Sequence, residues 1–248
     1  MPKKKKHIDH NNLDFFGHLE VFRWKIISII VMLLVAMVAS FVFIDKVIYF
    51  LKIPVMHIPV ELIYVRPQEK FVTYIKIAFF SGLFATVPLA VIQAGSFIFP
   101  AMHKKERPFF ISVVIFIILF FFAGSAFSYF FLTPTVFNFF TNFAKDDGVK
   151  ALWSVNEYFN MLILIIFMMG LLFQTPWVIM TLIKLKIVKL ETLVKFRRHI
   201  IIGILIVAAV VTPTVDLYTQ GIVALVLYLL FEFTVLFARI FMREKKKK

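Results

Sequence analysis

Glu106 stands out because it is an acid set among cations, in a short polar stretch between two long apolar runs. The stretch, residues 97–108, reads FIFPAMHKKERP and carries Lys104, Lys105 and Arg107 as well. At a membrane surface such an acid can be the docking point for a basic ligand. The other interpretation is a solvated ion pair between Glu106 and a neighbouring cation, and such surface pairs are common and weak. From the chemistry alone the second interpretation is favoured.

Other polar side chains occur within or beside apolar runs. Gln174 is interpreted as an amide that joins helices, which is favoured over a role in translocation, because an amide in lipid must face other helices or water. Asp216 follows a Thr-Pro break and is either a solvated acid or a functional one. We expect Glu232 to reach the membrane surface or to pair with a cation there. Glu20 and Arg23 have the spacing of a helical ion pair.

Several kinds of chemistry are excluded by the residues that the sequence lacks. It contains no cysteine, so disulfides and thiol catalysis are excluded. No metal-ligand spacing, nucleophile motif or glycine-rich phosphate loop occurs, and the apolar runs hold no histidine. We therefore expect no metal, no cofactor and no enzymatic activity.

The composition is that of a membrane protein. Of the 248 residues, 61% are hydrophobic, whereas soluble domains have about 45–50% apolar residues. The net charge of +14 does not indicate nucleic-acid binding, because 21 of the 28 Lys and Arg residues lie in the two tails and in the loops at 101–108 and 183–199. By the positive-inside rule, this pattern predicts that both tails and these loops are cytoplasmic.

The apolar runs predict a single all-α transmembrane domain of six helices, with tails at 1–25 and 239–248. The helical spacing of apolar residues near the end of the first tail also predicts an interfacial helix. The fifth run has 12 residues, about 18 Å as a helix, which is too short for a hydrocarbon core of about 30 Å. We therefore expect the connection at 212–220 to dip into the membrane and open a polar notch. The spans are expected at about 26–44, 76–99, 109–132, 159–182, 200–211 and 221–238.

Short motifs recur at the ends of these runs in a fixed order. They are His18–Arg23, Pro67–Phe71 with Lys76, Phe97–Pro100 with Glu106 and Arg107, Phe127–Tyr129 with Pro134, Gly170–Pro176, Arg197 and Arg198, Thr212 and Pro213 with Asp216 and Gln220, and Leu230–Glu232 with Arg239. Through the order and spacing of these motifs and the expected six spans, nearly the whole chain resembles TatC, the polytopic subunit of the twin-arginine protein translocase.

The resemblance implies an all-helical, concave cup in the bacterial inner membrane, with an organellar inner membrane as the alternative. It implies a receptor that binds twin-arginine signal peptides of folded cargo at the cytoplasmic face. It also implies assembly with single-span TatA/TatB-like partners, homo-oligomers within the complex, and export driven by the proton-motive force. The implied peptide-binding residues are Glu106, Glu20, Phe97, Arg23 and Arg107, with Gln174 and Asp216 as the intramembrane polar pair.

The sequence departs from the family pattern at three places. Val21 stands where the family has an acid, Gln174 replaces an acid in the fourth span, and one extra residue separates Thr212 from Asp216. The alternative function is an ion-coupled transporter of small solutes. Such a transporter has an inverted repeat and an ionisable site at mid-membrane, but no repeat is visible and the deepest polar residue is the uncharged Gln174.

Overall fold

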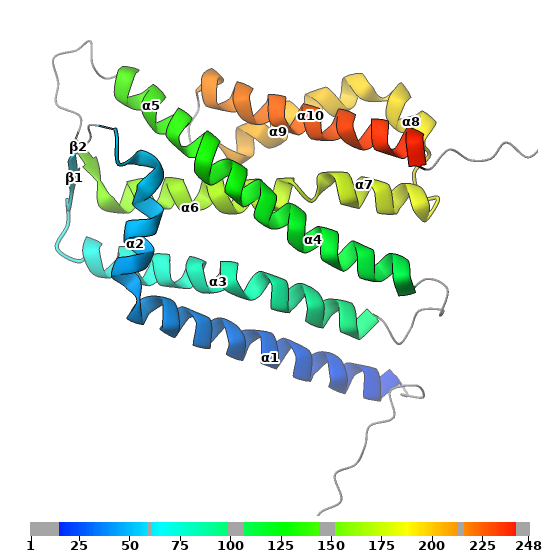
Figure 1. Ribbon diagram of the computed structural model, residues 1–248, viewed down its shortest axis with the longest axis horizontal. Helices are drawn as coiled ribbons and strands as arrows, with labels where there is room; N and C mark the ends of the chain where they lie inside the picture. The colour runs from blue at the N-terminus through cyan, green and yellow to red at the C-terminus, as the bar shows by residue number, and fades with distance from the viewer. Residues whose placement is uncertain (1–14, 59–60, 99–106, 144–151, 213–215, 242–248) are drawn as a thin grey trace, which may run out of the picture. The chain divides into compact units, whose positions relative to one another are not determined.

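The computed structural model describes residues 15–58, 61–98, 107–143, 152–212 and 216–241, and helices make up most of them (Figure 1). Two short strands, a 3₁₀ turn and a π-helical turn are the other regular elements of these ranges. In chain order the elements are α1 (Phe15–Val42), α2 (Ile44–Lys52), the 3₁₀ turn η1 (Ile53–Val55), β1 (Glu61–Ile63), α3 (Glu69–Ile98), α4 (Arg107–Phe127), the π-helical turn η3 (Ser128–Leu132), α5 (Thr133–Phe143), β2 (Leu152–Ser154), α6 (Val155–Leu172), α7 (Thr175–Lys184), α8 (Leu190–Lys195), α9 (Arg197–Val211) and α10 (Leu217–Phe241).

Among the described residues, five helical segments are long and apolar enough to cross a membrane. They are Leu19–Val42, Glu69–Phe97, Arg107–Phe143, Val155–Lys184 and Leu217–Ile240. The helix α9 covers the expected fifth span and has 15 residues, fewer than the roughly 20 that a spanning helix needs. The all-α membrane class is confirmed, and the count of six spans stays a prediction.

Several helices extend beyond the spans expected from hydropathy. The helix α1 begins at Phe15 and runs unbroken to Val42, so the end of the first tail belongs to this helix and is not a separate interfacial helix. The third helix continues past residue 132 to Phe143 through η3, where the N–H of Thr133 donates to the carbonyl of Ser128. Pro134 then lies in the first turn of α5, where a missing N–H is tolerated.

The fourth helix is broken where the sequence places Pro176. The segment α6 ends at Leu172 and α7 begins at Thr175, with the proline in the first turn of α7. At the junction the N–H of Gln174 donates to the carbonyl of Leu171, and the hydroxyl of Thr175 donates to the carbonyl of Leu172 at 2.6 Å. The missing N–H of Pro176 would have bonded the Leu172 carbonyl, and the Thr175 hydroxyl bonds that carbonyl instead.

The chain forms two compact units. Unit 1, Met1–Phe43 and Ala78–Ile118, contains α1, most of α3 and the first half of α4. Its helices approach closely at two glycines: a Cβ added to Gly82 would lie 2.7 Å from the backbone nitrogen of Met37, and one added to Gly95 would lie 2.9 Å from Cγ2 of Val114. The first contact joins α3 to α1 and the second joins α3 to α4.

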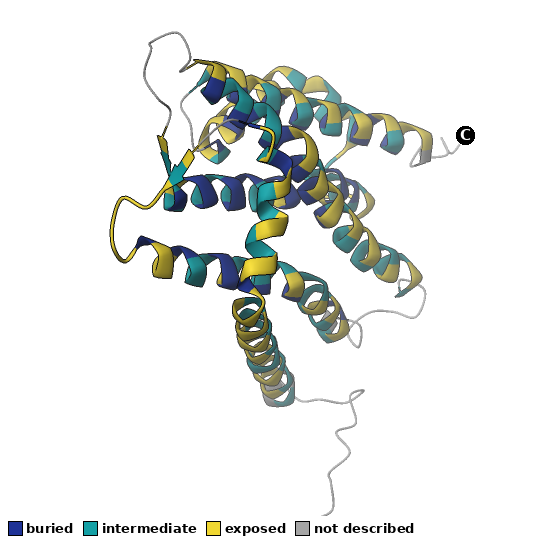
Figure 2. Cartoon of the chain, turned by 60° about the vertical axis from the view of Figure 1, so that its left-hand side comes forward, coloured by how far each residue is buried: buried dark blue, intermediate teal, exposed yellow. Residues whose placement is uncertain are grey.

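Unit 2, Ile44–Ile77 and Leu119–Lys248, contains the remaining elements and a continuous apolar core. In Figure 2 buried residues mark the inner sides of α5, α6 and α10. Here α4 and α6 also meet at glycines, because a Cβ on Gly124 would lie 2.6 Å from the Met169 carbonyl oxygen and one on Gly170 would lie 2.5 Å from Oγ of Ser125. The core residues are Leu132, Val136, Ile165, Met169, Ala208, Val223, Ala224 and Leu227.

The strands β1 and β2 pair in parallel, and no local pattern in the sequence predicts them. Leu62 lies opposite Trp153 in the register. The carboxylate of Glu69, 7% exposed, fixes this junction. It accepts hydrogen bonds from the backbone of Val65 and Arg66 and from Ser154 and Asn156 across the strand pair. The start of α3 is thereby tied to the start of α6.

Candidate functional site

The amino-terminal half of α1 carries two of the expected peptide-binding residues, Glu20 and Arg23, and both are exposed. They do not form the expected ion pair within the described part of α1. The guanidinium carbon of Arg23 instead lies 6.0 Å from the centroid of the Trp24 ring. The Glu20 carboxylate is therefore on the surface of unit 1 without an arginine from its own helix.

Phe97, another expected site residue, packs against this part of α1. Its ring centroid lies 5.3 Å from that of Phe22, with 49° between the ring planes. Offset aromatic contacts of this kind contribute about 0.5–1.5 kcal/mol beyond the area that they bury. Phe97 is half-buried and Phe22 is 47% exposed, so the pair forms part of the unit's surface. The contact brings the motif of the first helix to the end of the second span.

A polar network beside these rings holds α1 to α3. The Lys25 ammonium donates to the backbone carbonyl of Gln93 at 3.3 Å and to the hydroxyl of Ser96. The Gln93 amide donates to the Ser28 hydroxyl at 3.0 Å. The sequence analysis missed this network. The sequence does contain a pattern that indicates it: Lys25 and Ser28 are polar residues one helical turn apart in an apolar run, and so are Gln93 and Ser96.

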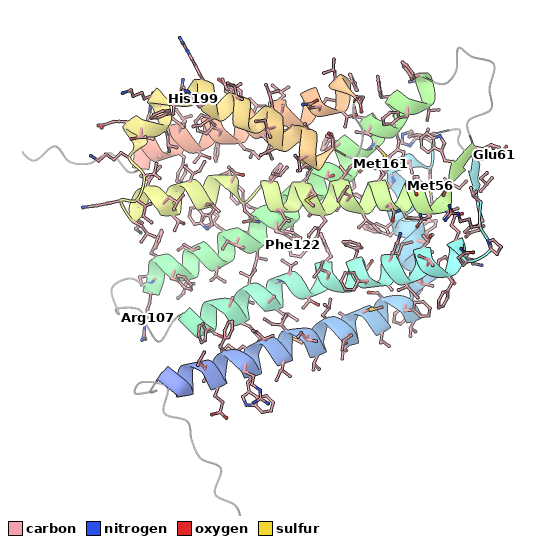
Figure 3. All side chains as sticks on the ribbon, turned by 180° about the vertical axis from the view of Figure 1, so that it is seen from behind. Met56, Glu61, Arg107, Phe122, Met161 and His199 are labelled. Carbon is pink, nitrogen blue, oxygen red and sulfur yellow. The ribbon has the colours of Figure 1, made fainter. Side chains whose placement is uncertain are left out.

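Arg107 is the first residue of α4 and is half-buried (Figure 3). The close approach of Gly95 to Phe110 and Val114 places the start of α4 beside the end of α3. Unit 1 therefore gathers Arg107 and Phe97 at neighbouring helix ends. Glu106, which precedes Arg107 directly, lies outside the described residues.

The two polar residues that the sequence predicts within the membrane both belong to unit 2. Gln174 is half-buried at the break between α6 and α7, and its amide nitrogen lies 3.4 Å from the Gly170 carbonyl. Asp216 precedes α10, and its carboxylate accepts from the N–H of Thr219 at 2.6 Å, the geometry of a helix cap. Both therefore have local structural contacts, and their functional roles stay predictions. Residues 213–215, in the expected notch, lie outside the described residues.

Glu232 pairs with a cation, one of the two outcomes expected for it. Its Oε2 lies 2.9 Å from Nη2 of Arg197, the first residue of α9. The pair links α9 to α10, which lie side by side in unit 2 (Figure 1). In the ranges that the structure describes, no three His, Asp or Glu side chains are arranged to hold a metal ion.

The family model "Sec-independent protein translocase protein (TatC)" matches residues 17–225. The chain belongs to the TatC family. It is therefore related to protein translocase components and not to enzymes. This assignment favours protein translocation over the transport of small solutes.

Similar proteins come from chloroplasts and bacteria. The chloroplastic "Sec-independent protein translocase protein TATC" of Arabidopsis thaliana is 33% identical over 90% of this chain, which spans 65% of that relative's length. The TatC protein of Synechocystis sp. is 33% identical over 87% of this chain and 84% of its own length. A crystal structure described as "Twin Arginine Translocase Receptor- TatC in DDM" matches with a TM-score of 0.77 and 29% identity, over 89% of this chain and 98% of that one. This TatC-family chain thus has the family fold and is a multi-pass membrane protein.

Proposed function

We propose that the chain is the receptor subunit of a twin-arginine translocase and binds signal peptides through unit 1. The observation that carries the proposal is the contact between Phe22 and Phe97, at 5.3 Å. It joins two motifs that lie far apart in the sequence and leaves apolar ring surface exposed on the unit that also carries the exposed acid Glu20. A signal peptide that carries arginines next to an apolar segment would meet both chemistries there.

Glu106 is the principal anion of this site, and Glu20 contributes less. Glu232 is already paired with Arg197, and Glu191 lies in a segment so basic that it would repel an arginine pair. Asp9, Asp14 and Glu244 belong to or adjoin the polar tails of the sequence. The family's second acid is Val21 here, about 100° around the helix from Glu20, so more of the binding falls on Glu106. The acids on the expected cytoplasmic side are Asp9, Asp14, Glu20, Glu106, Glu191, Glu232 and Glu244.

The wider assembly follows from the same proposal. The chain has both termini in the cytoplasm, resides in a bacterial inner membrane or an organellar equivalent, and forms homo-oligomers within a complex that includes TatA/TatB-like proteins. Export draws on the proton-motive force. The Lys and Arg distribution supports the orientation, and the relatives' description as Sec-independent translocase proteins supports the pathway.

The test is crosslinking of a twin-arginine peptide to variants in membranes. Removing one partner of a partly desolvated charge pair costs roughly 2–5 kcal/mol, so we expect Glu106→Gln to weaken binding strongly without unfolding the protein. Glu20→Gln weakens binding less. Val21→Glu strengthens it by restoring an acid at the family position.

The matched control is Glu191→Gln, which makes the same change of charge on the same expected side of the membrane. We expect it to bind the peptide as the wild type does. Wild-type binding by Glu106→Gln would return Glu106 to a solvated ion pair and refute its assignment.

A further inference from the structure

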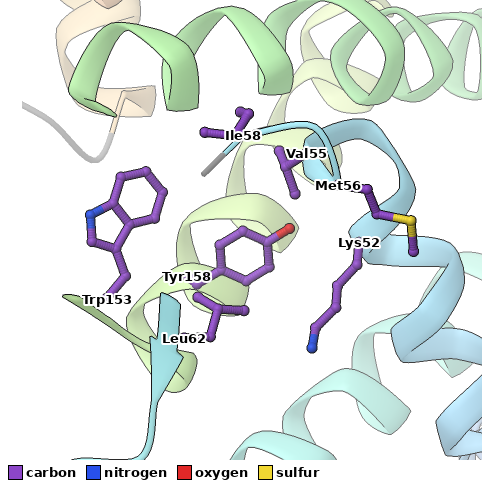
Figure 4. Close-up of a pocket in the computed structure, with 7 residues that line it drawn as sticks. All are labelled: Lys52, Val55, Met56, Ile58, Leu62, Trp153 and Tyr158. Carbon is purple, nitrogen blue, oxygen red and sulfur yellow. The ribbon is translucent and has the colours of Figure 1, made fainter. Parts of the chain in front are cut away.

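Unit 2 contains a cavity of about 370 Å³ near the strand pair (Figure 4). Its volume lies within the range of about 300–1,000 Å³ that is usual for small-molecule sites. It shares no residue with the peptide site proposed above. The lining side chains are Lys52, Val55, Met56, Ile58, Leu62, Trp153 and Tyr158.

The walls of the cavity are held by contacts outside it. The strand register places Leu62 opposite Trp153. On the other side, the Tyr129 hydroxyl donates to the carbonyl of Phe50, whose ring stacks on Tyr129 at a centroid distance of 4.9 Å. This contact fixes the end of α2, from which Lys52 extends into the lining. The cavity is therefore built by fixed elements.

The polar side chains that line the cavity are all hydrogen-bond donors. Lys52 brings an ammonium that makes no hydrogen bond or ion pair within the described ranges, and Trp153 turns the six-membered part of its ring toward the other lining residues (Figure 4). Tyr158 is 4% exposed, and its hydroxyl has no partner among the residues described. A buried hydroxyl without a partner is unfavourable. Because the seven lining residues include no carboxylate, the cavity suits an anion with acceptor oxygens.

The position of the cavity relative to the candidate span indicates which kind of anion it would bind. Tyr158 lies in the first turn of α6, which begins the candidate span Val155–Lys184, and Trp153 lies just before that span. Trp, Tyr and Lys are typical of the level at which hydrocarbon meets headgroups. The remaining lining residues are apolar and would contact a glycerol backbone and the first methylenes of a lipid. A free phosphate would leave these apolar groups without a partner.

We propose that this cavity binds the phosphodiester headgroup of an anionic phospholipid. Lys52 provides the charge, Tyr158 provides a neutral donor, and the Trp153 ring provides part of the apolar wall. Bound lipid would tie α2, the strand pair and α6 together at the membrane surface. The proposal stands apart from peptide binding, so either can fail while the other holds.

The test uses the full chain in phosphatidylcholine nanodiscs that contain a minor fraction of photoactivatable phosphatidylglycerol. Crosslinks are expected in peptides that contain Lys52 or Trp153. Lys52→Gln should lower the yield about fivefold, the effect of losing one cation near a membrane surface. Tyr158→Phe should lower it less, and Lys52→Arg should retain it.

The matched control is Lys46→Gln, which removes the same charge from α2 outside the cavity and should leave the yield unchanged. Equal thermal midpoints in pure phosphatidylcholine would show that the variants are folded. If Lys52→Gln does not fold, a lower crosslink yield in Tyr158→Phe with a retained yield in Lys52→Arg supports the proposal, and equal yields in Tyr158→Phe and the wild type overturn it. An equal loss in Lys46→Gln, competition by inorganic phosphate, or no crosslink at the cavity would overturn the proposal.

Discussion

The two units differ in how much apolar surface they bury. Among the described residues of unit 1, Ala78 is the sole buried apolar side chain apart from glycines, whereas unit 2 buries whole aromatic rings such as Phe121, Phe137, Phe159 and Phe231. In Figure 2 the helix α1 has no dark blue, the colour of buried residues, whereas α6 has dark blue stripes. Unit 2 has an interior like that of other folded domains, and unit 1 is a layer of helices.

This difference shows which forces hold each unit together. In lipid, exposed apolar side chains cost little, so close backbone approach and polar contacts decide how helices associate. Unit 1 has both, in the contact of Gly82 with Met37 and in the network around Lys25. We infer that unit 1 can adjust when it binds a peptide, because few packed side chains must be displaced, and that unit 2 is the stable framework.

The largest effect on thermal stability is expected when a side chain is added to a glycine at a close helix contact in unit 2. In Gly170→Ala the new methyl would meet Ser125 Oγ at 2.5 Å and the Phe121 ring at 2.9 Å. Overpacking of this kind costs about 1–3 kcal/mol. We expect a lower thermal midpoint in detergent and loss of folded protein.

Gly221→Ala is the control, because a Cβ at that position of α10 would meet nothing within 4 Å. Alanine favours a helix over glycine, so this variant should be as stable as the wild type or more so. Equal midpoints for Gly170→Ala and Gly221→Ala would contradict the account of a tightly packed unit 2.

In unit 1 we expect a substitution to change peptide affinity, by a smaller amount, rather than thermal stability. Lys25→Met keeps the apolar stem but removes the donor to Gln93 and Ser96. A hydrogen bond contributes about 1 kcal/mol, so we expect affinity for a twin-arginine peptide to fall about fivefold while the thermal midpoint changes little. Lys189→Met, which removes an exposed lysine, should change neither quantity. A large drop in the midpoint of Lys25→Met would show that the network supports the whole fold.

The smallest effect on the thermal midpoint is expected for Glu232→Gln. The side chains of Arg197 and Glu232 are 38% and 29% exposed, so water screens the pair, and exposed pairs contribute about 0.2–1 kcal/mol. The thermal midpoint should fall by less than in Gly170→Ala, and peptide crosslinking should be unchanged. If Glu232→Gln lost peptide binding, Glu232 would belong to the site and the choice of Glu106 would have to be revised.

The helices could be predicted from the sequence because long apolar runs are a local signal. Helix ends were less accurate, since Thr133 and Pro134 were interpreted as the end of a span, whereas a π-helical turn carries the helix on to Phe143. The strand pair could not be predicted. Its three-residue strands join Leu62 to Trp153, and no local pattern shows that segments so far apart pair.

The family motifs point to Glu20 and Phe97 as site residues, and their roles stay predictions. What the sequence could not show is the partner of each residue. The ring contact of Phe97 with Phe22 and the bonds of Lys25 to α3 depend on how two helices pack. The donor-lined cavity also escaped prediction, because Lys52, Leu62 and Trp153 come from three separate elements.

The central claim is that this chain recognises the arginine pair of a signal peptide. The most direct measurement is co-purification of the wild-type protein from membranes with a twin-arginine signal peptide and with the same peptide carrying two lysines. Because a guanidinium can donate two parallel bonds to a carboxylate and an ammonium cannot, we predict that the arginine peptide is retained and the lysine peptide is lost. Equal retention of the two peptides would contradict the account.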